Sequence, residues 1–200
     1  MNKIKVLVEG YAKVNTDGTW DATCTTTLID TGKLKVIMDP GCNRKLLLEA
    51  LENEGIETSD IDYVFLSHYH PDHCLLIGIF ENATIFDSVQ WQKGPIGGET
   101  PETLPDTDVR IVKTPGHTAD HASLLVNTDQ GKILVGADVF WWGDNEEQKV
   151  DIDKTDDFAE DMISLKESRK KALEIADYII PGHGKMFEVS FQSRGKIASW

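Results

Sequence analysis

The chain has 200 residues, of which 40% are hydrophobic and 27% charged, and this composition is typical of a globular protein rather than a disordered one. Its length suits one domain spanning residues 1–200. The formal net charge is −14, which argues against an extended nucleic-acid surface or an anionic membrane as partner, although a local positive centre such as a metal could still hold an anionic substrate.

The first part of the chain predicts strands and one helix. Three short apolar runs are of the strand type: Ile4–Val8, Thr23–Ile29 and Leu34–Met38. A turn-forming Asp-Thr-Gly at residues 30–32 separates the last two runs, which predicts a hairpin. Leucines at helical spacing then predict a helix over Asn43–Glu54, with Asn43 as its N-cap and Gly55 as its stop.

The rest of the chain adds more strands and a second helix. Six further apolar runs predict short strands: Tyr63–Leu66, Ala83–Phe86, Val109–Val112, Ser123–Val126, Ile133–Val135 and Tyr178–Ile180. An apolar stripe predicts a long amphipathic helix over Asp156–Ala176, capped by Thr155 or Asp156. Many strands with only two helical segments favour a layered α/β sandwich over a sheet in which strands and helices alternate.

Two long segments, Ser88–Asp108 and Phe140–Asp153, are predicted to be irregular. Irregular segments of this length inside a compact domain are more often functional rims than simple connections. We therefore expect them to border a substrate pocket, with Trp141 or Trp142 at its edge, whereas Trp91 could serve either core or rim.

The cysteines and the N-terminus predict a soluble, cytoplasmic protein. The three cysteines, Cys24, Cys42 and Cys74, are far apart, and none forms a C-x-x-C unit, so a reducing compartment is expected. Cys74 has apolar neighbours, which favours packing over nucleophilic catalysis. No signal peptide or membrane span is recognisable in the sequence. The sequence leaves open whether the protein forms a homodimer.

Histidines cluster directly after the strand predicted at Tyr63–Leu66. Residues 68–73 read His-Tyr-His-Pro-Asp-His, so three of the six histidines and one aspartate fall within six positions. Neutral imidazole and carboxylate are the ligands that zinc and similar divalent metals take. Solvated surface histidines would not gather in this way, and the cluster therefore predicts a metal site.

Four other predicted strands end in tight turns that each carry one metal-capable side chain. These turns are Asp39-Pro40-Gly41, Thr114-Pro115-Gly116-His117, Gly136-Ala137-Asp138 and Pro181-Gly182-His183-Gly184. Strand ends that meet at one edge of a sandwich can place such residues in one pocket. One turn of this kind is weak support, but four of them together with the histidine cluster are strong support for a shared site.

The ordered motifs, from Asp39 to Gly184, resemble the signature of the metallo-β-lactamase superfamily, and the segment Glu167–Asp177 resembles one group of small enzymes within it. The resemblance implies an α/β fold, a four-layer αββα sandwich of two mixed β-sheets flanked by helices. It also implies two divalent metal ions, zinc in the first place, with iron or manganese as alternatives. The implied ligands are His68, His70 and His117 for one metal, Asp72, His73 and His183 for the other, and Asp138 between them. Asp39 would orient a ligand histidine through its ring N–H.

The implied activity is hydrolysis by a hydroxide that bridges the two metals, with Asp72 and Asp138 as catalytic residues. His121 is either hydrogen-bonded beside the ligands, the reading we favour, or a proton donor to the leaving group. The resemblance favours phosphodiester hydrolysis of the RNA-endonuclease kind, on a small molecule or a short oligonucleotide. The alternatives are a lactone, thioester or β-lactam-like hydrolase, a mono-iron sulfur dioxygenase and, in a different class, a binding module without catalysis.

Overall fold

The computed structural model describes residues 1–190, so residues 191–200 of the predicted domain lie outside the described part. Two mixed sheets dominate it. The first sheet contains β1 (Lys3–Val8), β4 (Thr26–Asp30), β5 (Lys35–Met38), β6 (Tyr63–Phe65), β7 (Thr84–Phe86), β8 (Gln90–Lys93) and β9 (Ile96–Glu99), in this order. The second contains β10 (Arg110–Lys113), β11 (Ala122–Thr128), β12 (Gly131–Trp141), β13 (Tyr178–His183) and β14 (Phe187–Glu188).

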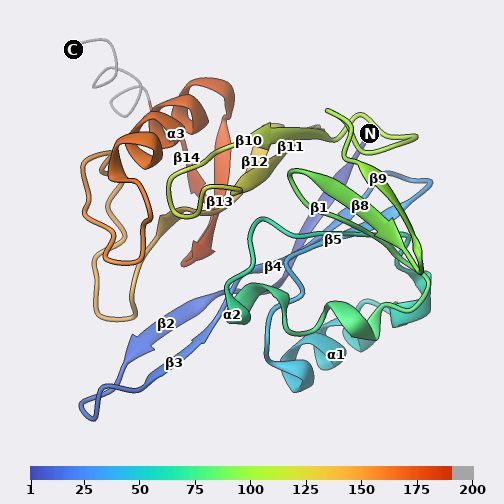
Figure 1. Cartoon of the computed structure of the whole chain (residues 1–200), viewed down its shortest axis with the longest axis horizontal. Helices are drawn as coiled ribbons and strands as arrows, with labels where there is room; N and C mark the ends of the chain where they lie inside the picture. Colours follow the sequence, from blue (N-terminus) through green and yellow to red (C-terminus); the bar gives the residue numbers. More distant parts are fainter. Residues whose placement is uncertain (191–200) are drawn as a thin grey trace.

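The helices lie on the outer faces of the two sheets. α1 (Arg44–Asn53) lies against the first sheet and α3 (Met162–Ile175) against the second, while the hairpin of β2 (Tyr11–Val14) and β3 (Trp20–Thr23) extends away from both (Figure 1). Short helical turns make up the remainder: η1 (Thr58–Asp60), α2 (Pro71–Cys74) and η2 (Ile77–Ile79). This arrangement confirms the predicted αββα sandwich.

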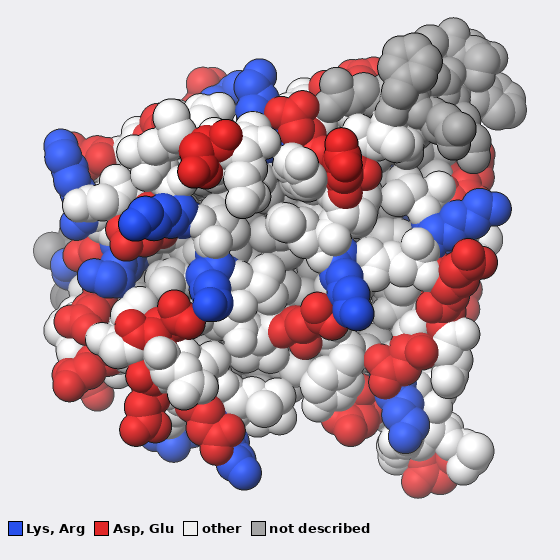
Figure 2. Space-filling model, turned by 180° about the vertical axis from the view of Figure 1, so that it is seen from behind, with Lys and Arg blue, Asp and Glu red and all other residues white. Residues whose placement is uncertain are grey.

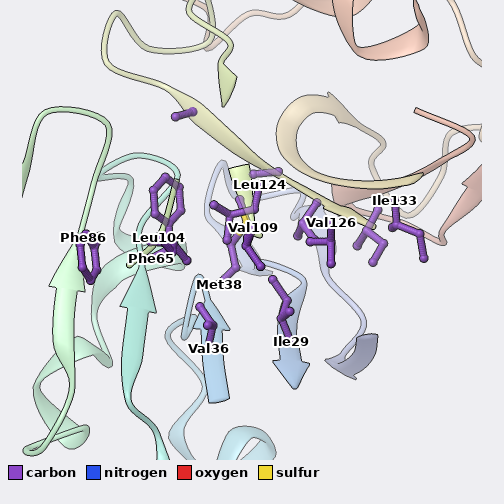
Figure 3. Packing of buried hydrophobic residues seen from close by; sticks show 14 residues of the cluster. Ile29, Val36, Met38, Phe65, Phe86, Leu104, Val109, Leu124, Val126 and Ile133 are labelled. Atoms are coloured by element: carbon purple, nitrogen blue, oxygen red, sulfur yellow. The ribbon is translucent and has the colours of Figure 1, made fainter. Parts of the chain in front are cut away.

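Alternating side chains explain why four layers form. In β5, Met38 packs between the two sheets while its neighbour Ile37 packs on the opposite face against α1. In β12, Val135 likewise points between the sheets and Leu134 points towards α3. Figure 3 shows the layer between the sheets, where side chains of the first sheet meet those of the second. Both sheets are therefore buried on two faces, which their near-continuous apolar runs require.

The predicted elements around α1 are confirmed. Asn43 caps the helix, because its side chain accepts a hydrogen bond from the main-chain N–H of Leu46, and Gly55 follows the helix with φ at +67°. β4 and β5 pair as the expected antiparallel hairpin. The run predicted at Thr23–Ile29 is interrupted between β3 and β4, so it serves two different sheets.

The segment 88–108 is not irregular throughout, contrary to the prediction. It contains the hairpin of β8 and β9, which extends the edge of the first sheet. Gly94 has φ at +56°, and this positive value allows the tight turn between the two strands. The prolines and glycines of this segment therefore mark turns and an edge strand rather than a long loop.

The second predicted helix begins later than expected. α3 starts at Met162, and its N-cap is Asp161, whose side chain accepts from the main-chain N–H groups of Ile163 and Ser164. The expected start at Asp156 is wrong, and Asp156 lies in the loop that follows β12. No helix in the described part of the chain is long and apolar enough to cross a membrane.

Leucine truncation in α1 measures how much the outer apolar layer contributes to stability. Leu51 is 1% exposed and Leu46 is 38% exposed on the same helix. We expect Leu51→Ala to lower the free energy of unfolding by about 2–5 kcal/mol, because a cavity remains where the side chain was. Leu46→Ala should change it by no more than about 1 kcal/mol. Urea denaturation of the metal-free protein measures both values, and equal losses would contradict the assignment of Leu51 to the core.

Candidate metal centre

Side chains from both sheets meet where the strands end. Residues 68–73 follow β6, His117 follows β10, Asp138 lies within β12, and His183 ends β13. Their possible ligand atoms form two groups, each within 4.8 Å: His68, His70, His117 and Asp138 in the first, and Asp72, His73 and His183 in the second. The structure therefore brings together all seven residues predicted as ligands, in the grouping that the sequence resemblance implied.

Asp138 lies between the two groups. One of its oxygens, Oδ2, is 3.2 Å from Nε2 of His117, and the other, Oδ1, is 3.4 Å from Nε2 of His73. Nδ1 of His70 is 3.0 Å from Nε2 of His117. Ligand atoms bound at about 2.0–2.1 Å to a tetrahedral zinc lie roughly 3.3–3.4 Å apart. The spacing therefore fits side chains arranged around cations.

Hydrogen bonds fix the orientation of two ligand histidines in the core of the site. Nδ1 of His73 donates to Asp39 Oδ2 at 2.8 Å. Nδ1 of His68 lies 2.8 Å from Ser67 Oγ, which itself donates to Asp39 Oδ2 at 2.6 Å. With the proton of each ring on Nδ1, the lone pair of Nε2 points into the centre. Asp39 thus has the geometry predicted for it, whereas the contribution of Ser67 was not predicted.

Asp156 orients a third histidine and was missed as a functional residue. Its Oδ2 accepts from Nδ1 of His117 at 2.8 Å, in a buried position. The apolar spacing of α3 extends back to this point, so Thr155 or Asp156 was predicted to be the helix cap. Nδ1 of His183 is held differently, 3.0 Å from the main-chain oxygen of Tyr11.

The main chain around Asp138 is shaped to hold its carboxylate. Ala137 has φ at +45°, a value that non-glycine residues rarely adopt, and the pairing of β12 with β13 is irregular on both sides of it. Gly182 of β13 faces the carboxylate so closely that a Cβ at this position would collide with Oδ1 of Asp138. Glycine at 182 is therefore required by space.

Charges in the site are coupled. Burial raises the pKa of Asp138, but the positive charge of neighbouring histidines, His73 foremost, outweighs burial and holds this pKa well below its usual range. Burial lowers the pKa of His117, but Asp138 outweighs it and the pKa rises to about 9. Burial lowers the pKa of both His68 and His70. In the metal-free protein, protons on histidine thus supply positive charge that a cation would replace.

Unpaired polar atoms test whether the residues suit a metal. Nε2 of His68, Nε2 of His73 and Oδ1 of Asp138 are buried without a hydrogen-bond partner within residues 1–190. Buried polar atoms without partners are rare, and cations bound at the two groups would satisfy all three. A third group of potential ligands, Cys24 with Asp39 and His73, suits a metal less well, because burial raises the pKa of the Cys24 thiol to about 12 and so disfavours the thiolate.

His121 lies behind the ligands. Its ring centre is 5.2 Å from that of His68, its Nδ1 is 2.9 Å from Thr114 Oγ1, and the side chain is buried. Burial lowers the pKa of His121 to about 3, so the ring is neutral at physiological pH. This geometry agrees better with a histidine that packs against the ligands than with a proton donor.

A pocket of about 410 Å³ opens over the two groups. His70, Asp72, His117, Asp138 and His183 form its metal-facing wall. The rest of the lining comes from the β2–β3 hairpin, from the end of β12 and from the chain that follows, and its apolar members include Ala12, Val14, Trp20, Ala22, Trp141 and Phe158. The expected pocket-edge position of one tryptophan is filled by Trp141.

Two rim predictions do not match the residues that line this pocket. Trp142 is buried in the apolar core beneath α3, and its ring stacks on that of Phe140. No residue of the segment 88–108 lines the pocket in the described structure, and Trp91 packs against the core between the sheets. The β2–β3 hairpin, which was not predicted, takes this place. The Asp17-Gly18 pair between two short alternating runs is the sequence signal that could have revealed it.

Comparison with known proteins agrees with this geometry. The sequence model of the metallo-beta-lactamase superfamily matches residues 20–89. The chain is 34% identical over 198 residues to "Metallo-beta-lactamase domain-containing protein 1" of Xenopus laevis, which covers 94% of this chain and 82% of the relative. The superfamily resemblance of the ordered motifs is thereby confirmed.

Solved structures confirm the fold. A putative metallo-beta-lactamase from Thermotoga maritima superposes with a TM-score of 0.72 at 22% identity, covering 94% of this chain and 99% of the other. AidC, described as a dizinc quorum-quenching lactonase in complex with a product, superposes with a TM-score of 0.59 at 19% identity, covering 82% of this chain and 74% of the other.

Gly182→Ala tests the packing behind Asp138. The added methyl group would displace the carboxylate, so we expect the affinity for Zn²⁺ to fall at least about tenfold. Gly78→Ala is the matched control, because a Cβ at Gly78 meets no atom within 4 Å. Competition with a chromophoric chelator measures the affinity of each folded variant. Equal affinity in Gly182→Ala and the wild type would show that the carboxylate is not held by this contact.

Proposed function

This chain belongs to the metallo-β-lactamase superfamily and is a metal-dependent hydrolase, and from that premise we propose that it binds two divalent metal ions, zinc in the first place, and cleaves a carbonyl ester bearing an apolar or aromatic group. The proposed substrates are lactones and thioesters. The observation that carries the proposal is the pocket, in which a mostly apolar wall faces the clustered histidines and carboxylates.

The residues that would hold the metals follow from the two groups. His68, His70 and His117 would bind one ion, Asp72, His73 and His183 the other, and Asp138 would bind both. When bound, such a pair of cations lowers the pKa of water and polarises the bond to be cleaved. No side-chain nucleophile is required, which agrees with the burial of Cys24.

The chain's own carboxylates accept hydrogen bonds and protons in the site, and its apolar side chains contact the substrate. Asp138 is ionised at neutral pH, since its pKa lies well below the usual range, and its oxygens can accept hydrogen bonds within the site. Asp72 lines the pocket and keeps a lowered pKa. Burial raises this pKa, but the hydrogen bond to His183 together with the charges of His73 and His183 outweighs burial. We assign Asp72 as the acceptor of a proton released beside the substrate. His121 does not line the pocket, so we assign no proton transfer to it.

Apolar and aromatic side chains around the pocket favour a substrate with an apolar arm. Val14 and Trp20 on the hairpin are largely exposed and both line the pocket, so they offer apolar surface to a ligand bound there. Trp141 and Phe158 continue this surface on the other side, with ring centres 5.9 Å apart. An acyl chain or an aromatic ring would bury these faces. The similarity in fold to AidC, a lactonase, supports the same class of substrate.

Charge around the pocket counts against a long polyanion. The pocket wall contains one basic residue, Lys13, and the acidic Asp144 and Glu146 stand beside it. Figure 2 shows one face of the molecule, on which acidic and basic side chains are interspersed. A nucleic-acid backbone is tracked by clustered lysine and arginine, so carboxylates at the rim would repel it.

A short phosphodiester is the second candidate. The sequence resemblance favours it, and Lys13 in the pocket wall could contact one phosphate. Two metal ions would also neutralise a single phosphodiester, whose charge is only −1. The choice between the two substrate classes rests on measurement of both activities.

Metal analysis combined with parallel assays tests the proposal. Purified protein should contain two divalent ions per chain by elemental analysis. It should hydrolyse an acyl-homoserine lactone or an acyl thioester faster than bis-p-nitrophenyl phosphate, compared by kcat/KM. A higher kcat/KM on the phosphate diester would select the second candidate. One tightly held iron with no second metal would instead indicate the dioxygenase alternative.

Substitutions on the hairpin test the apolar arm. Val14 lines the pocket at 73% exposure, and Val89 is 60% exposed away from it. We expect Trp20→Ala and Val14→Ala to raise KM for a hexanoyl ester about three- to tenfold with little change in kcat, because the buried apolar area is lost equally before and during reaction. Val89→Ala is the matched control and should leave KM unchanged. If neither pocket variant alters KM for long or short acyl chains, the hairpin does not contact the substrate.

A further inference from the structure

Arg169, in the middle of α3, is the largest fully buried side chain in the described residues, at 1% exposure. It belongs to the segment 167–177, which resembles one group of small enzymes within the superfamily. This segment contributes no candidate ligand to the metal centre. A guanidinium group is costly to bury unless its N–H donors are satisfied. The partners of Arg169 therefore indicate what it stabilises.

The guanidinium group joins two segments through main-chain oxygens. Its Nε donates to Val139 at 2.9 Å, and its Nη1 donates to Ile152 at 3.3 Å and to Lys154 at 2.5 Å. Val139 directly follows Asp138 in β12, whereas Ile152 and Lys154 belong to the loop that leads to Asp156. Arg169 thus holds the strand of one carboxylate against the loop of another. Lysine has no planar fork of donors with which to span both segments.

These two carboxylates contact opposite sides of one histidine ring. Oδ2 of Asp156 is 2.8 Å from Nδ1 of His117, and Oδ2 of Asp138 is 3.2 Å from Nε2 of the same ring. The distance between the two segments therefore sets the position of the ring. If the loop moved away, His117 would lose the acceptor that fixes its proton on Nδ1 and its lone pair on Nε2.

A neighbouring residue of α3 supports the same histidine from its own turn. Ser168 Oγ donates to the main-chain oxygen of Pro115 at 2.7 Å. Gly116 packs so closely on Leu165 that a Cβ there would collide with the helix. The helix thus contacts the turn that carries His117 as well as the two segments that hold the carboxylates.

The second ligand group takes its orientation from other parts of the chain. His73 donates to Asp39, and His183 to the main-chain oxygen of Tyr11. Neither contact involves α3. A change at Arg169 should therefore act on the group of His68, His70, His117 and Asp138 more than on the group of Asp72, His73 and His183.

We infer that Arg169 is a positioning residue for the metal centre, which clamps the loop of Asp156 to the strand of Asp138 and so fixes the ring of His117 for one of the two metal ions. This inference rests on the two-metal centre proposed above. A buried arginine that does not line the pocket would thus control the affinity for one ion.

The test measures metal affinity rather than catalysis. Zn²⁺ is titrated in competition with a chromophoric chelator into wild type, Arg169→Met, Arg169→Lys, Asp156→Asn and the double variant Arg169→Met/Asp156→Asn. Lys170→Met is the matched control, because Lys170 neighbours Arg169 on α3 but pairs with Glu167 on the exposed side. Thermal unfolding of each metal-free variant reports folding separately.

We expect two bound ions in the wild type and in Lys170→Met. In Arg169→Met one of the two ions should bind about 10–100-fold more weakly and the other should be affected less, and Arg169→Lys should behave similarly. The double variant should lose no more affinity than the larger single loss, because both residues act through one histidine ring. The Co²⁺-substituted protein should show a changed absorption spectrum at one site only.

Other outcomes overturn the inference. Arg169 would be merely structural if its variants unfold at lower temperature yet bind both ions with wild-type affinity, or if neither variant folds without metal. Losses that add in the double variant would mean that Arg169 does not act through Asp156. A wild-type protein that binds no divalent ion would overturn the two-metal proposal itself and this inference with it, whereas two ions bound with wild-type affinity in every variant would overturn this inference alone.

Discussion

The carboxylate of Asp138 is buried between two groups of histidines, and this arrangement constrains the rest of the site. A buried negative charge must be compensated by positive charge. In the metal-free protein, protonated imidazoles around Asp138 supply it, and in a metal-bound protein the cations would supply it. The carboxylate also needs space, which glycine at 182 provides, and a particular direction, which the unusual main chain at Ala137 provides. The tight space at Gly182 and the unusual main chain at Ala137 would each be unfavourable alone, and the position of the carboxylate explains both.

The layered core supplies the rigidity that this arrangement needs. Asp138 and His183 lie on the adjacent parallel strands β12 and β13, which pack between α3 and the first sheet. The histidines of residues 68–73 come from the other sheet, so the centre exists only when the two sheets are packed together. The apolar layer between the sheets therefore determines the distance between the two halves of the site.

Sequence patterns revealed the candidate ligands because most of them lie at or shortly after the end of a recognisable apolar strand. The run at Tyr63–Leu66 and the Gly-Ala-Asp at 136–138 needed no knowledge of long-range contacts. Asp156 could not be found in this way, because its partner His117 lies 39 residues earlier and its place before α3 resembles a helix cap. The β2–β3 hairpin was missed since each of its strands has only four residues and is interrupted by a charged side chain. Local spacing thus predicted the histidine cluster, whereas the contact between Asp156 and the distant His117 could not be read from it.

Main-chain carbonyl groups of the hairpin hold parts of the site in place, while side chains of the same hairpin line the pocket. His183 is oriented by the carbonyl of Tyr11, and the N–H of Asp144 donates to the carbonyl of Ala12 at 2.8 Å. Every amino acid carries this carbonyl, so the hairpin can exchange its side chains without disturbing the histidine. Chemistry and selectivity are thereby separated in the sequence. Mutation at Val14 or Trp20 could adapt the protein to new substrates in single steps, while the clustered histidines and carboxylates stay constant.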